Sequence, residues 1–107
     1  MARDPECIFC RIVAGEIPSE KVYEDEHVLA FRDIHPIAPL HVLFIPKDHV
    51  ATLDDIPDDD PTLLRVAAAV RKVTRALGIA EKGYRVLMNV NKEGGQVIFH
   101  YHLHLLA

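Results

Sequence analysis

The run Phe99-His100-Tyr101-His102-Leu103-His104-Leu105-Leu106 places three histidines at alternate positions. Successive side chains of a β-strand point to opposite faces, so the pattern predicts a strand over residues 98–106 with imidazoles on one face and apolar side chains on the other. This apolar alternation distinguishes the run from an added histidine tag. Because histidine has an ordinary pKa of about 6.5, such an array can supply a nucleophile, a proton donor or metal ligands near neutral pH. We expect the strand to carry chemistry.

Length and composition are typical of a single globular domain over residues 1–107. Half of the 107 residues are hydrophobic, 26% are charged, and the formal net charge is −4. The mildly acidic balance argues against a broad nucleic-acid surface. No apolar run approaches the length of a membrane span, and the first residues lack the apolar stretch of a signal peptide. We therefore expect a cytoplasmic protein that binds neither nucleic acid nor membrane.

Periodicity and turn signals predict two helices and five strands. The longer helix is expected over 61–77, with Asp60 as its N-cap and Gly78 after its end. Its packing stripe is predicted as Leu63, Val66, Ala67, Val70, Thr74 and Leu77. The other elements are a short helix over 7–14, which packs through Ile8, Ile12 and Phe9, and strands over 21–24, 27–33, 41–46, 84–90 and 98–106. Strands joined by short links around one long helix indicate an antiparallel α+β domain.

Two further features could bind a ligand. Cys7 and Cys10 are separated by two residues, a spacing that in a reducing compartment indicates half of a zinc site or a redox pair. The loop Gly94-Gly95-Gln96 precedes the histidines, and its backbone N–H groups and amide could hold an anion. By itself this loop is equally the turn of a plain hairpin. Next to three imidazoles, it suggests a phosphate held where a histidine can attack it.

Five separated motifs, in order and spacing, resemble those of the histidine triad (HIT) superfamily. They are residues 94–106, Cys7-Ile8-Phe9-Cys10 with Gly15-Glu16-Ile17-Pro18, Ala30-Phe31-Arg32-Asp33-Ile34, Ala38-Pro39-Leu40-His41, and Ile45-Pro46-Lys47-Asp48-His49. The branch with the strongest resemblance is the adenosine phosphoramidase-like one. The resemblance implies a HIT-like fold, paired in a homodimer into a ten-stranded sheet. It also implies hydrolysis of nucleoside 5′-phosphoramidates or related AMP conjugates.

The resemblance implies a separate role for each histidine of the site. His102 would attack the α-phosphorus and form a nucleotidyl-histidine that water then cleaves, while a backbone carbonyl holds its other ring nitrogen. His104 would hold the phosphate oxygens. His41 would complete the hydrogen-bonded set with the triad and assist protonation of the leaving amine.

The resemblance also implies a site for a purine nucleotide. Asp33 would accept both ribose hydroxyls, although a strand-end aspartate can equally cap the next turn. Asn89 would contact the nucleotide near the phosphate and ribose, and Gly95, Gln96 and Val97 would stabilise charge on the phosphoryl oxygens. The apolar slot for the base would consist of Ile8, Phe9, Ile12, Phe31, Ile34 and Leu43.

The chain departs from this branch at one position of the loop. The residue after Gln96 is often Ser or Thr there, whereas Val97 offers only its backbone N–H. The difference bears on the leaving group.

Members of the superfamily that keep the cysteine pair commonly use it to bind zinc. By resemblance, the ligands here would be Cys7, Cys10, His49 and His100. Four protein ligands leave no open position, so the zinc would be structural rather than catalytic. No organic cofactor is expected.

Three alternatives remain open at this point. The first is a dinucleoside polyphosphate hydrolase of the same superfamily, and the second is a nucleotide-binding scaffold or regulatory module. The third is a hydrolase with an open-site zinc ligated by His100, His102 and His104. It is disfavoured because the outer two of three alternate strand residues lie about 7 Å apart.

Overall fold

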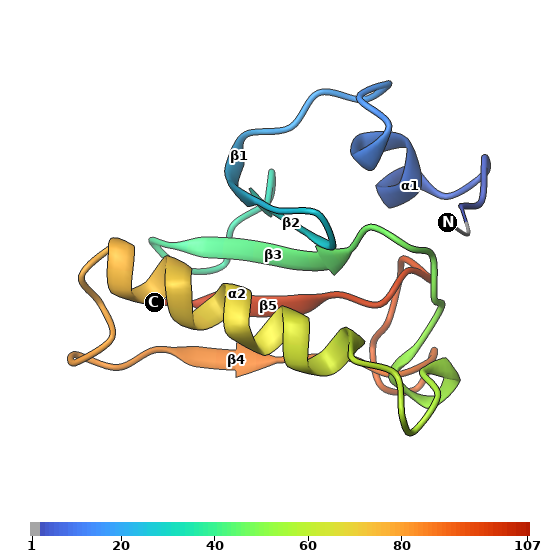
Figure 1. Cartoon of the computed structure of the whole chain (residues 1–107). Helices are drawn as coiled ribbons and strands as arrows, with labels where there is room; N and C mark the ends of the chain where they lie inside the picture. Colours follow the sequence, from blue (N-terminus) through green and yellow to red (C-terminus); the bar gives the residue numbers. More distant parts are fainter. Residues whose placement is uncertain (1–2) are drawn as a thin grey trace.

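The computed structural model describes residues 3–107, which form a five-stranded antiparallel sheet with a helix packed on each face (Figure 1). In chain order the elements are α1 (Ile8–Val13), β1 (Lys21–Glu24), β2 (Val28–Arg32), β3 (His41–Pro46), the 3₁₀ turn η1 (Leu53–Asp55), α2 (Thr62–Ala76), β4 (Arg85–Leu87) and β5 (Leu103–Leu106). The predicted α+β class, with five antiparallel strands, one long helix and a short N-terminal helix, is confirmed.

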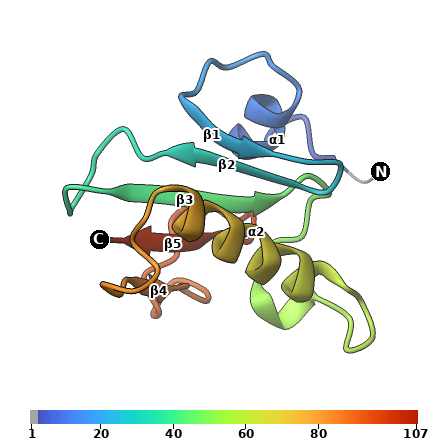
Figure 2. The same ribbon diagram turned by 60° about the vertical axis from the view of Figure 1, so that its left-hand side comes forward.

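The strands lie in the order β1-β2-β3-β5-β4, so the C-terminal strand is inserted between β3 and β4. His41 pairs with Leu106, and Leu43 pairs with His104, across the β3–β5 ladder. This register places His41 of β3 and His104 of β5 side by side. The histidine-rich end of the chain therefore occupies the interior of the sheet (Figures 1 and 2).

The two faces of the sheet bury different sets of side chains. Val28, Ala30, Val42 and Phe44 pack on the α2 side, together with Tyr101, Leu103 and Leu105. The opposite face carries Leu29, Phe31, Leu43 and Ile45, which pack against Cys7, Phe9, Cys10 and Ile12 at α1. The strict alternation along β2 and β3 is that of strands buried on both faces.

Helix α2 packs through a stripe that differs from the predicted one. Its buried residues are Val66, Ala69, Val70, Val73 and Thr74. Leu63, Ala67 and Leu77, which were predicted to pack, are exposed. The observed set follows i, i+3, i+4, i+7 and i+8, so both stripes satisfy helical periodicity and the sheet selects one of them. Pro61 occupies the N-cap position, while Asp60 still accepts a hydrogen bond from the Thr62 amide.

Strands β4 and β5 are shorter than predicted. The β3–β5 ladder ends at the Phe44–Leu103 pair. Continuing the ladder would bring Tyr101 opposite Pro46, which has no N–H to donate. The Tyr101 amide donates instead to the carbonyl of Val50. His100 and His102 therefore lie outside regular strand structure. The predicted alternation nevertheless persists for residues 101–105, whereas Phe99 is 45% exposed.

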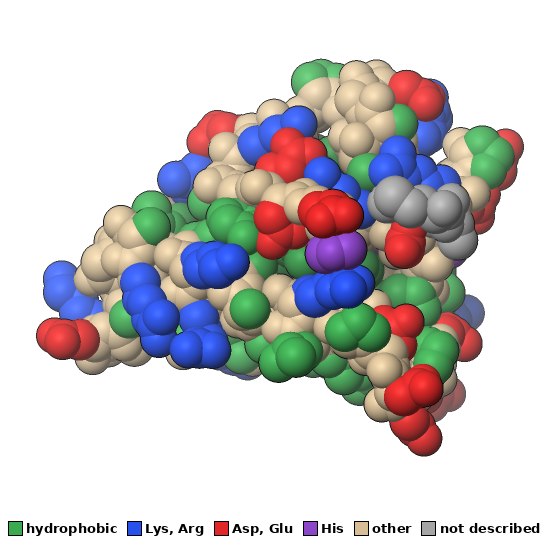
Figure 3. Space-filling model, in the orientation of Figure 1, with side chains coloured by type: hydrophobic (Ala, Val, Ile, Leu, Met, Phe, Trp, Pro, Cys, Tyr) green, Lys and Arg blue, Asp and Glu red, His purple; other side chains and the backbone are tan. Residues whose placement is uncertain are grey.

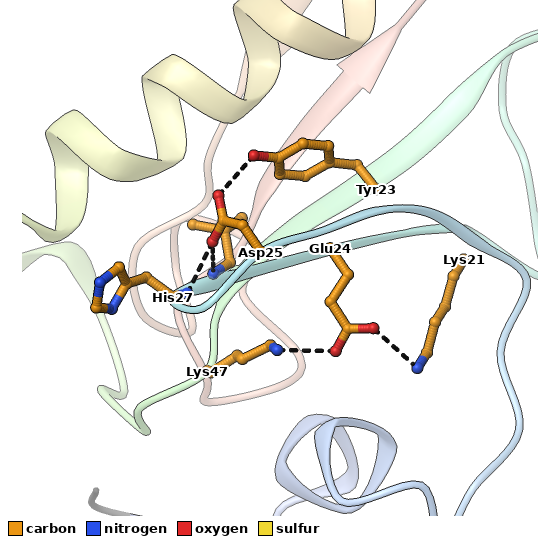
Figure 4. A network of polar contacts seen from close by, with 7 residues as sticks. Lys21, Tyr23, Glu24, Asp25, His27 and Lys47 are labelled. Carbon is orange, nitrogen blue, oxygen red and sulfur yellow. Dashed lines mark hydrogen bonds and ion pairs between the residues drawn. The ribbon is translucent and has the colours of Figure 1, made fainter.

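Polar contacts fasten the β1–β2 hairpin to the end of β3 (Figure 4). Asp25 accepts hydrogen bonds from the His27 and Val28 amides and from the Tyr23 hydroxyl. On the other side of the hairpin, Glu24 pairs with Lys47 directly after β3, with an Nζ–O distance of 2.8 Å. The hairpin thus holds Pro46 and Lys47 at the end of β3.

Helix α1 attaches to the rest of the molecule through side chains. Its N-cap is Cys7, whose Sγ accepts a hydrogen bond from the Cys10 amide. Phe9 packs edge-on against Phe31 of β2 and against the His102 ring. Ile8, which was expected on the packing face, is 48% exposed.

The α2 face mixes basic and apolar side chains (Figure 3). Leu63 and Leu64 are exposed at the first turn of the helix, and Arg71, Lys72 and Arg75 are exposed further along it. Among residues 3–107, no helix is both long enough and apolar enough to cross a membrane.

Candidate functional site

The ring of His102 is held in one orientation and one tautomer. Its Nδ1 lies 2.8 Å from the carbonyl oxygen of His100. A carbonyl can only accept, so Nδ1 carries the proton and Nε2 keeps a free lone pair. His102 also lines an open cavity on the α1 face of the sheet. The site therefore presents a fixed, unprotonated nitrogen to that cavity.

A second chain of hydrogen bonds fixes the tautomers of His41 and His104. The Ile37 amide donates to Nδ1 of His41, and Nε2 of His41 lies 2.9 Å from Nδ1 of His104. His41 therefore carries its proton on Nε2 and donates it to His104, whose own proton resides on Nε2. This Nε2 is buried and has no hydrogen-bond partner among the described residues. His104 thus directs an unused donor beside the free lone pair of His102.

Asp33 caps a turn and also lines the cavities of this face. Its Oδ1 accepts the His35 amide at 2.8 Å and so caps the turn after β2. Its Oδ2 lies 3.5 Å from Nε2 of His41. Asp33 also lines both cavities of this face, which leaves a carboxylate oxygen available between them.

Two adjoining cavities lie on this face of the sheet. The first has a volume of about 430 Å³ and contains His41, His102, His104, Asn89, Gly95 and Val97 in its lining. The second has a volume of about 280 Å³, and its walls include all six residues predicted for the base slot, namely Ile8, Phe9, Ile12, Phe31, Ile34 and Leu43. The exposure of Ile8 is explained here, because this side chain faces the slot.

The loop before the histidines differs from expectation in its use of Gln96. The Gln96 side chain is buried and donates to the carbonyls of Ala51 and Ile98, while its Oε1 accepts from the Asn91 amide. All of its bonds therefore brace the loop, and its amide does not line the cavity. The side chain that was expected to contact the phosphate is thus engaged with backbone groups in this structure.

The loop glycines also serve the loop itself. A Cβ at position 94 would lie 2.3 Å from the carbonyl oxygen of Val90, so only glycine fits. The amides of Gly94, Gly95 and Gln96 are all bonded within the loop. The Val97 amide has no such partner within the described chain, and Val97 lines the cavity. Of these four loop amides, that of Val97 is therefore the one left open to a ligand.

A separate cluster joins α1 to the histidine segment. Nδ1 of His100 lies 3.3 Å from Sγ of Cys7 and 3.5 Å from Sγ of Cys10, and Nδ1 of His49 lies 3.4 Å from Sγ of Cys10. Nε2 of His100 donates to the Pro46 carbonyl at 2.7 Å, which leaves the lone pair on Nδ1 facing the sulfurs. These four predicted residues form a group that could hold a metal ion.

The three histidines of the triad have three different partners. His100 faces sulfur, His102 faces a backbone carbonyl, and His104 faces His41. Neither possible metal-binding group found among residues 3–107 contains all three. This arrangement removes the support for an open-site metal ligated by the triad.

Burial keeps the imidazoles of His102 and His104 neutral by lowering their pKa values. It lowers the pKa of His104 to about 4, and the nearby His102 and His41 rings act in the same direction. Burial also lowers the pKa of His102, against the opposing effects of the His100 carbonyl and Asp33. A neutral imidazole is required both for a nitrogen nucleophile and for the observed tautomers.

Several lining residues were not predicted from the sequence. The larger cavity also contains His35, Ile37, Leu87, Ile98 and Leu106. His35 and Ile37 lie in a proline-containing segment whose sequence indicates only a connecting loop, so neither was predicted to line the site. The others have the apolar character of ordinary strand residues, so no sequence signal distinguishes them from core.

Comparison with known proteins was consistent across sequence and structure. A family model described as HIT domain matches residues 14–107. The chain is 46% identical over 103 residues to the purine nucleoside phosphoramidase of Escherichia coli K12, covering 95% of this chain and 87% of that protein. It is 45% identical over 112 residues to an adenosine 5′-monophosphoramidase of Candida albicans, covering 99% of this chain and 72% of that protein.

Solved structures give the same result. A histidine triad protein from Clostridium difficile superimposes with a TM-score of 0.96 at 44% identity, covering 98% of this chain and 92% of that one. A HIT family hydrolase from Legionella pneumophila gives a TM-score of 0.91 at 51% identity, covering 95% and 92%.

The lowered pKa of His104 predicts a pH-dependent loss of stability. The unfolded chain binds a proton near pH 6.5, whereas folded His104 does so only near 4. The contribution of neutral His104 to the free energy of unfolding is thus fully present above about pH 6.5 and is lost as the pH falls towards about 4. For this half-buried group the loss is on the order of 1–2 kcal/mol. Urea denaturation across this range should show a shallower pH dependence for His104→Gln than for wild type. Equal slopes would contradict the prediction, and His27→Gln on the hairpin is the control.

Proposed function

The chain belongs to the HIT domain family, and we propose that it hydrolyses the P–N bond of purine nucleoside 5′-phosphoramidates or related AMP conjugates. The observation that carries the proposal is the free Nε2 lone pair of His102 beside the unused Nε2–H of His104, at the junction of a polar and an apolar cavity. The names of the relatives supply the reaction class.

The reaction proceeds in two displacements. Nε2 of His102 attacks the α-phosphorus, the P–N bond breaks, and the amine leaves after taking a proton. Water then attacks the phosphorus of the nucleotidyl-His102, which releases AMP and restores the ring. The bond to the His100 carbonyl stabilises the ring while Nε2 carries the phosphoryl group.

Donors around the cavity stabilise the charge that develops on phosphorus. The Nε2–H of His104 and the N–H of Val97 are positioned to donate to phosphoryl oxygens. His41 donates to Nδ1 of His104 through their 2.9 Å contact and thereby keeps the proton of His104 on Nε2. The leaving amine takes its proton from water in the open cavity, and the water that attacks in the second displacement returns one. His100 contributes its backbone carbonyl, and its ring takes no part in proton transfer.

The two cavities accommodate the rest of the nucleotide. The purine occupies the apolar slot between α1 and β2, where Phe9 and Phe31 form an edge-on pair. The ribose hydroxyls bond to the free oxygen of Asp33, which lies between the two cavities. Asn89 and Gly95 line the phosphate side.

Replacement of His102 provides the direct test. His102→Ala should lower kcat/KM for AMP amidate by at least about 10³-fold, because no other group supplies the attacking lone pair. Rapid-quench mass spectrometry of wild type should show an AMP adduct on the histidine segment. His27→Ala, on the exposed hairpin, is the matched control. An unaffected cellular phenotype of His102→Ala, with an intact AMP-binding isotherm, would favour a scaffold, and faster turnover of dinucleoside polyphosphates would assign another branch.

We further propose that Cys7, Cys10, His49 and His100 hold one zinc ion. Four ligands at ordinary zinc distances in a tetrahedron place S and N atoms about 3.6 Å apart, close to the observed 3.3–3.5 Å separations. The site would be closed and would tie α1 to the histidine segment. Free thiols arranged in this way also support a reducing, cytoplasmic location.

Elemental analysis tests the zinc proposal. Protein purified without added metal or chelator should contain about one zinc per chain, and Cys10→Ser should lose it. His102→Ala should keep it, because that ring is not a ligand. Below about a tenth of an equivalent, with both thiols free, the proposal is wrong. Prompt loss of all activity on brief chelation would instead support an open-site metal.

We also propose a homodimer formed through α2 and β4. Leu63 and Leu64 of α2 and Tyr84 and Val86 at β4 are exposed apolar side chains, and β4 is an edge strand. Sedimentation equilibrium should give twice the chain mass. Leu64→Lys should shift the protein to monomer, whereas Ile34→Lys, at the base slot, should not. A monomeric wild type would contradict the proposal.

A further inference from the structure

We propose that the leaving group is a primary amine with an apolar substituent, and that the side chains of Val97 and Ile37 determine this preference. The inference rests on the proposed function, since it identifies the substrate class of the same site. It derives from the part of the larger cavity that the nucleotide does not occupy.

The positions of the subsites define where the leaving group lies. Base and ribose extend from the apolar slot to Asp33, and the α-phosphate lies between His102 and His104. A leaving group must depart opposite the attacking nitrogen and away from the ribose. What remains of the larger cavity for it is lined by Ile37, Leu87, Asn89, Gly95, Val97 and Leu106.

This remaining part of the cavity is apolar. Four of the six side chains are aliphatic, and Asn89 is the one polar side chain among them. Val97 is 84% exposed and Ile37 is 76% exposed, although both are apolar. A substrate group that covered them would remove this surface from water, at roughly 25 cal/mol per Å². An alkyl or aryl substituent makes that contact, whereas a charged one does not.

Charge points to the same class of leaving group. No lysine or arginine is among the described residues that line the larger cavity. A polyphosphate leaving group would bring several negative charges into this part of the cavity, where no lysine or arginine among the lining residues compensates them. The ammonium and carboxylate of an amino acid would likewise lose water without gaining partners. A neutral substituent avoids both penalties.

A substrate series compares leaving groups of similar chemistry. Hexylamine and the ε-amine of lysine have nearly equal basicity, so their AMP amidates differ mainly in the charged groups at the far end. We expect kcat/KM to be at least about tenfold higher for the hexyl amidate than for the lysine amidate. The ratio of the hexyl amidate to diadenosine tetraphosphate should be larger still. The unsubstituted AMP amidate reports whether the chemistry occurs at all.

Isosteric variants assign the preference to its residues. Val97→Thr keeps the shape and the backbone N–H but exchanges a methyl for a hydroxyl. It should lower the hexyl-to-lysine ratio about fourfold, as expected for one buried methyl group. Ile37→Thr should lower the ratio in the same direction. Ile79→Thr, at a half-buried isoleucine after α2 that lines neither cavity, is the control and should leave the ratio unchanged.

The outcomes separate this inference from the proposed function. If no amidate is hydrolysed, including the unsubstituted one, the proposed function fails and this inference fails with it. If the unsubstituted amidate is hydrolysed but the hexyl-to-lysine ratio is near one or below, only this inference is overturned. An unchanged ratio in both Val97→Thr and Ile37→Thr overturns the assignment to these residues.

Discussion

The hydrogen bond from the His102 ring to the carbonyl of His100 links the two halves of the site. It leaves one nitrogen free to face the cavity and the other positioned to stabilise a positively charged ring. Burial of His102 lowers its pKa and maintains the neutral form, and the carbonyl limits that effect. The ring of His100 is itself held by the Pro46 carbonyl and faces the two sulfurs. The orientation of the His102 ring, the proposed nucleophile, is therefore determined by the backbone of His100, whose own ring is held at the end of β3.

The sheet explains why these backbone atoms lie where they do. The central strand β3 is buried on both faces, and it pairs with β2 along its length and with β5 over four residues. Pro46 ends the second ladder because it has no amide proton. The segment before Leu103 is then free to leave the strand path and bond to the loop after β3. An interruption of regular structure thus creates the space in which His100 and His102 can take different partners.

Sequence reasoning recovered the features that depend on local pattern. The strand over 41–46 was predicted with its observed bounds, because an apolar run between proline-containing segments has few alternatives. The predicted packing stripe of α2 shares Val66, Val70 and Thr74 with the buried set but misses Ala69 and Val73. Periodicity alone does not decide whether Ala69 or its neighbours face the sheet. The start of β5 at Leu103 was not predicted, because it depends on Pro46 of the partner strand β3, which is distant in the sequence. The base slot and the sulfur–imidazole cluster came from the family resemblance. The bonds of Gln96 to the Ala51 and Ile98 carbonyls were not foreseen, because both a ligand and a backbone carbonyl are suitable partners for an amide.

The double anchoring of His100 has a consequence for how such a site can change during evolution. Its Nε2 is held by a backbone carbonyl that persists whatever side chains surround it, while only its Nδ1 depends on Cys7 and Cys10. A lineage can therefore replace the cysteines one at a time and retain a ring that stays in place, together with the carbonyl behind it. Replacement of His100 before the cysteines is disfavoured, because it would leave two buried thiols beside His49 without the His100 ring. The position of the His100 ring thus depends on a backbone group as well as on the two thiols, and the backbone group does not change with substitution of the cysteines.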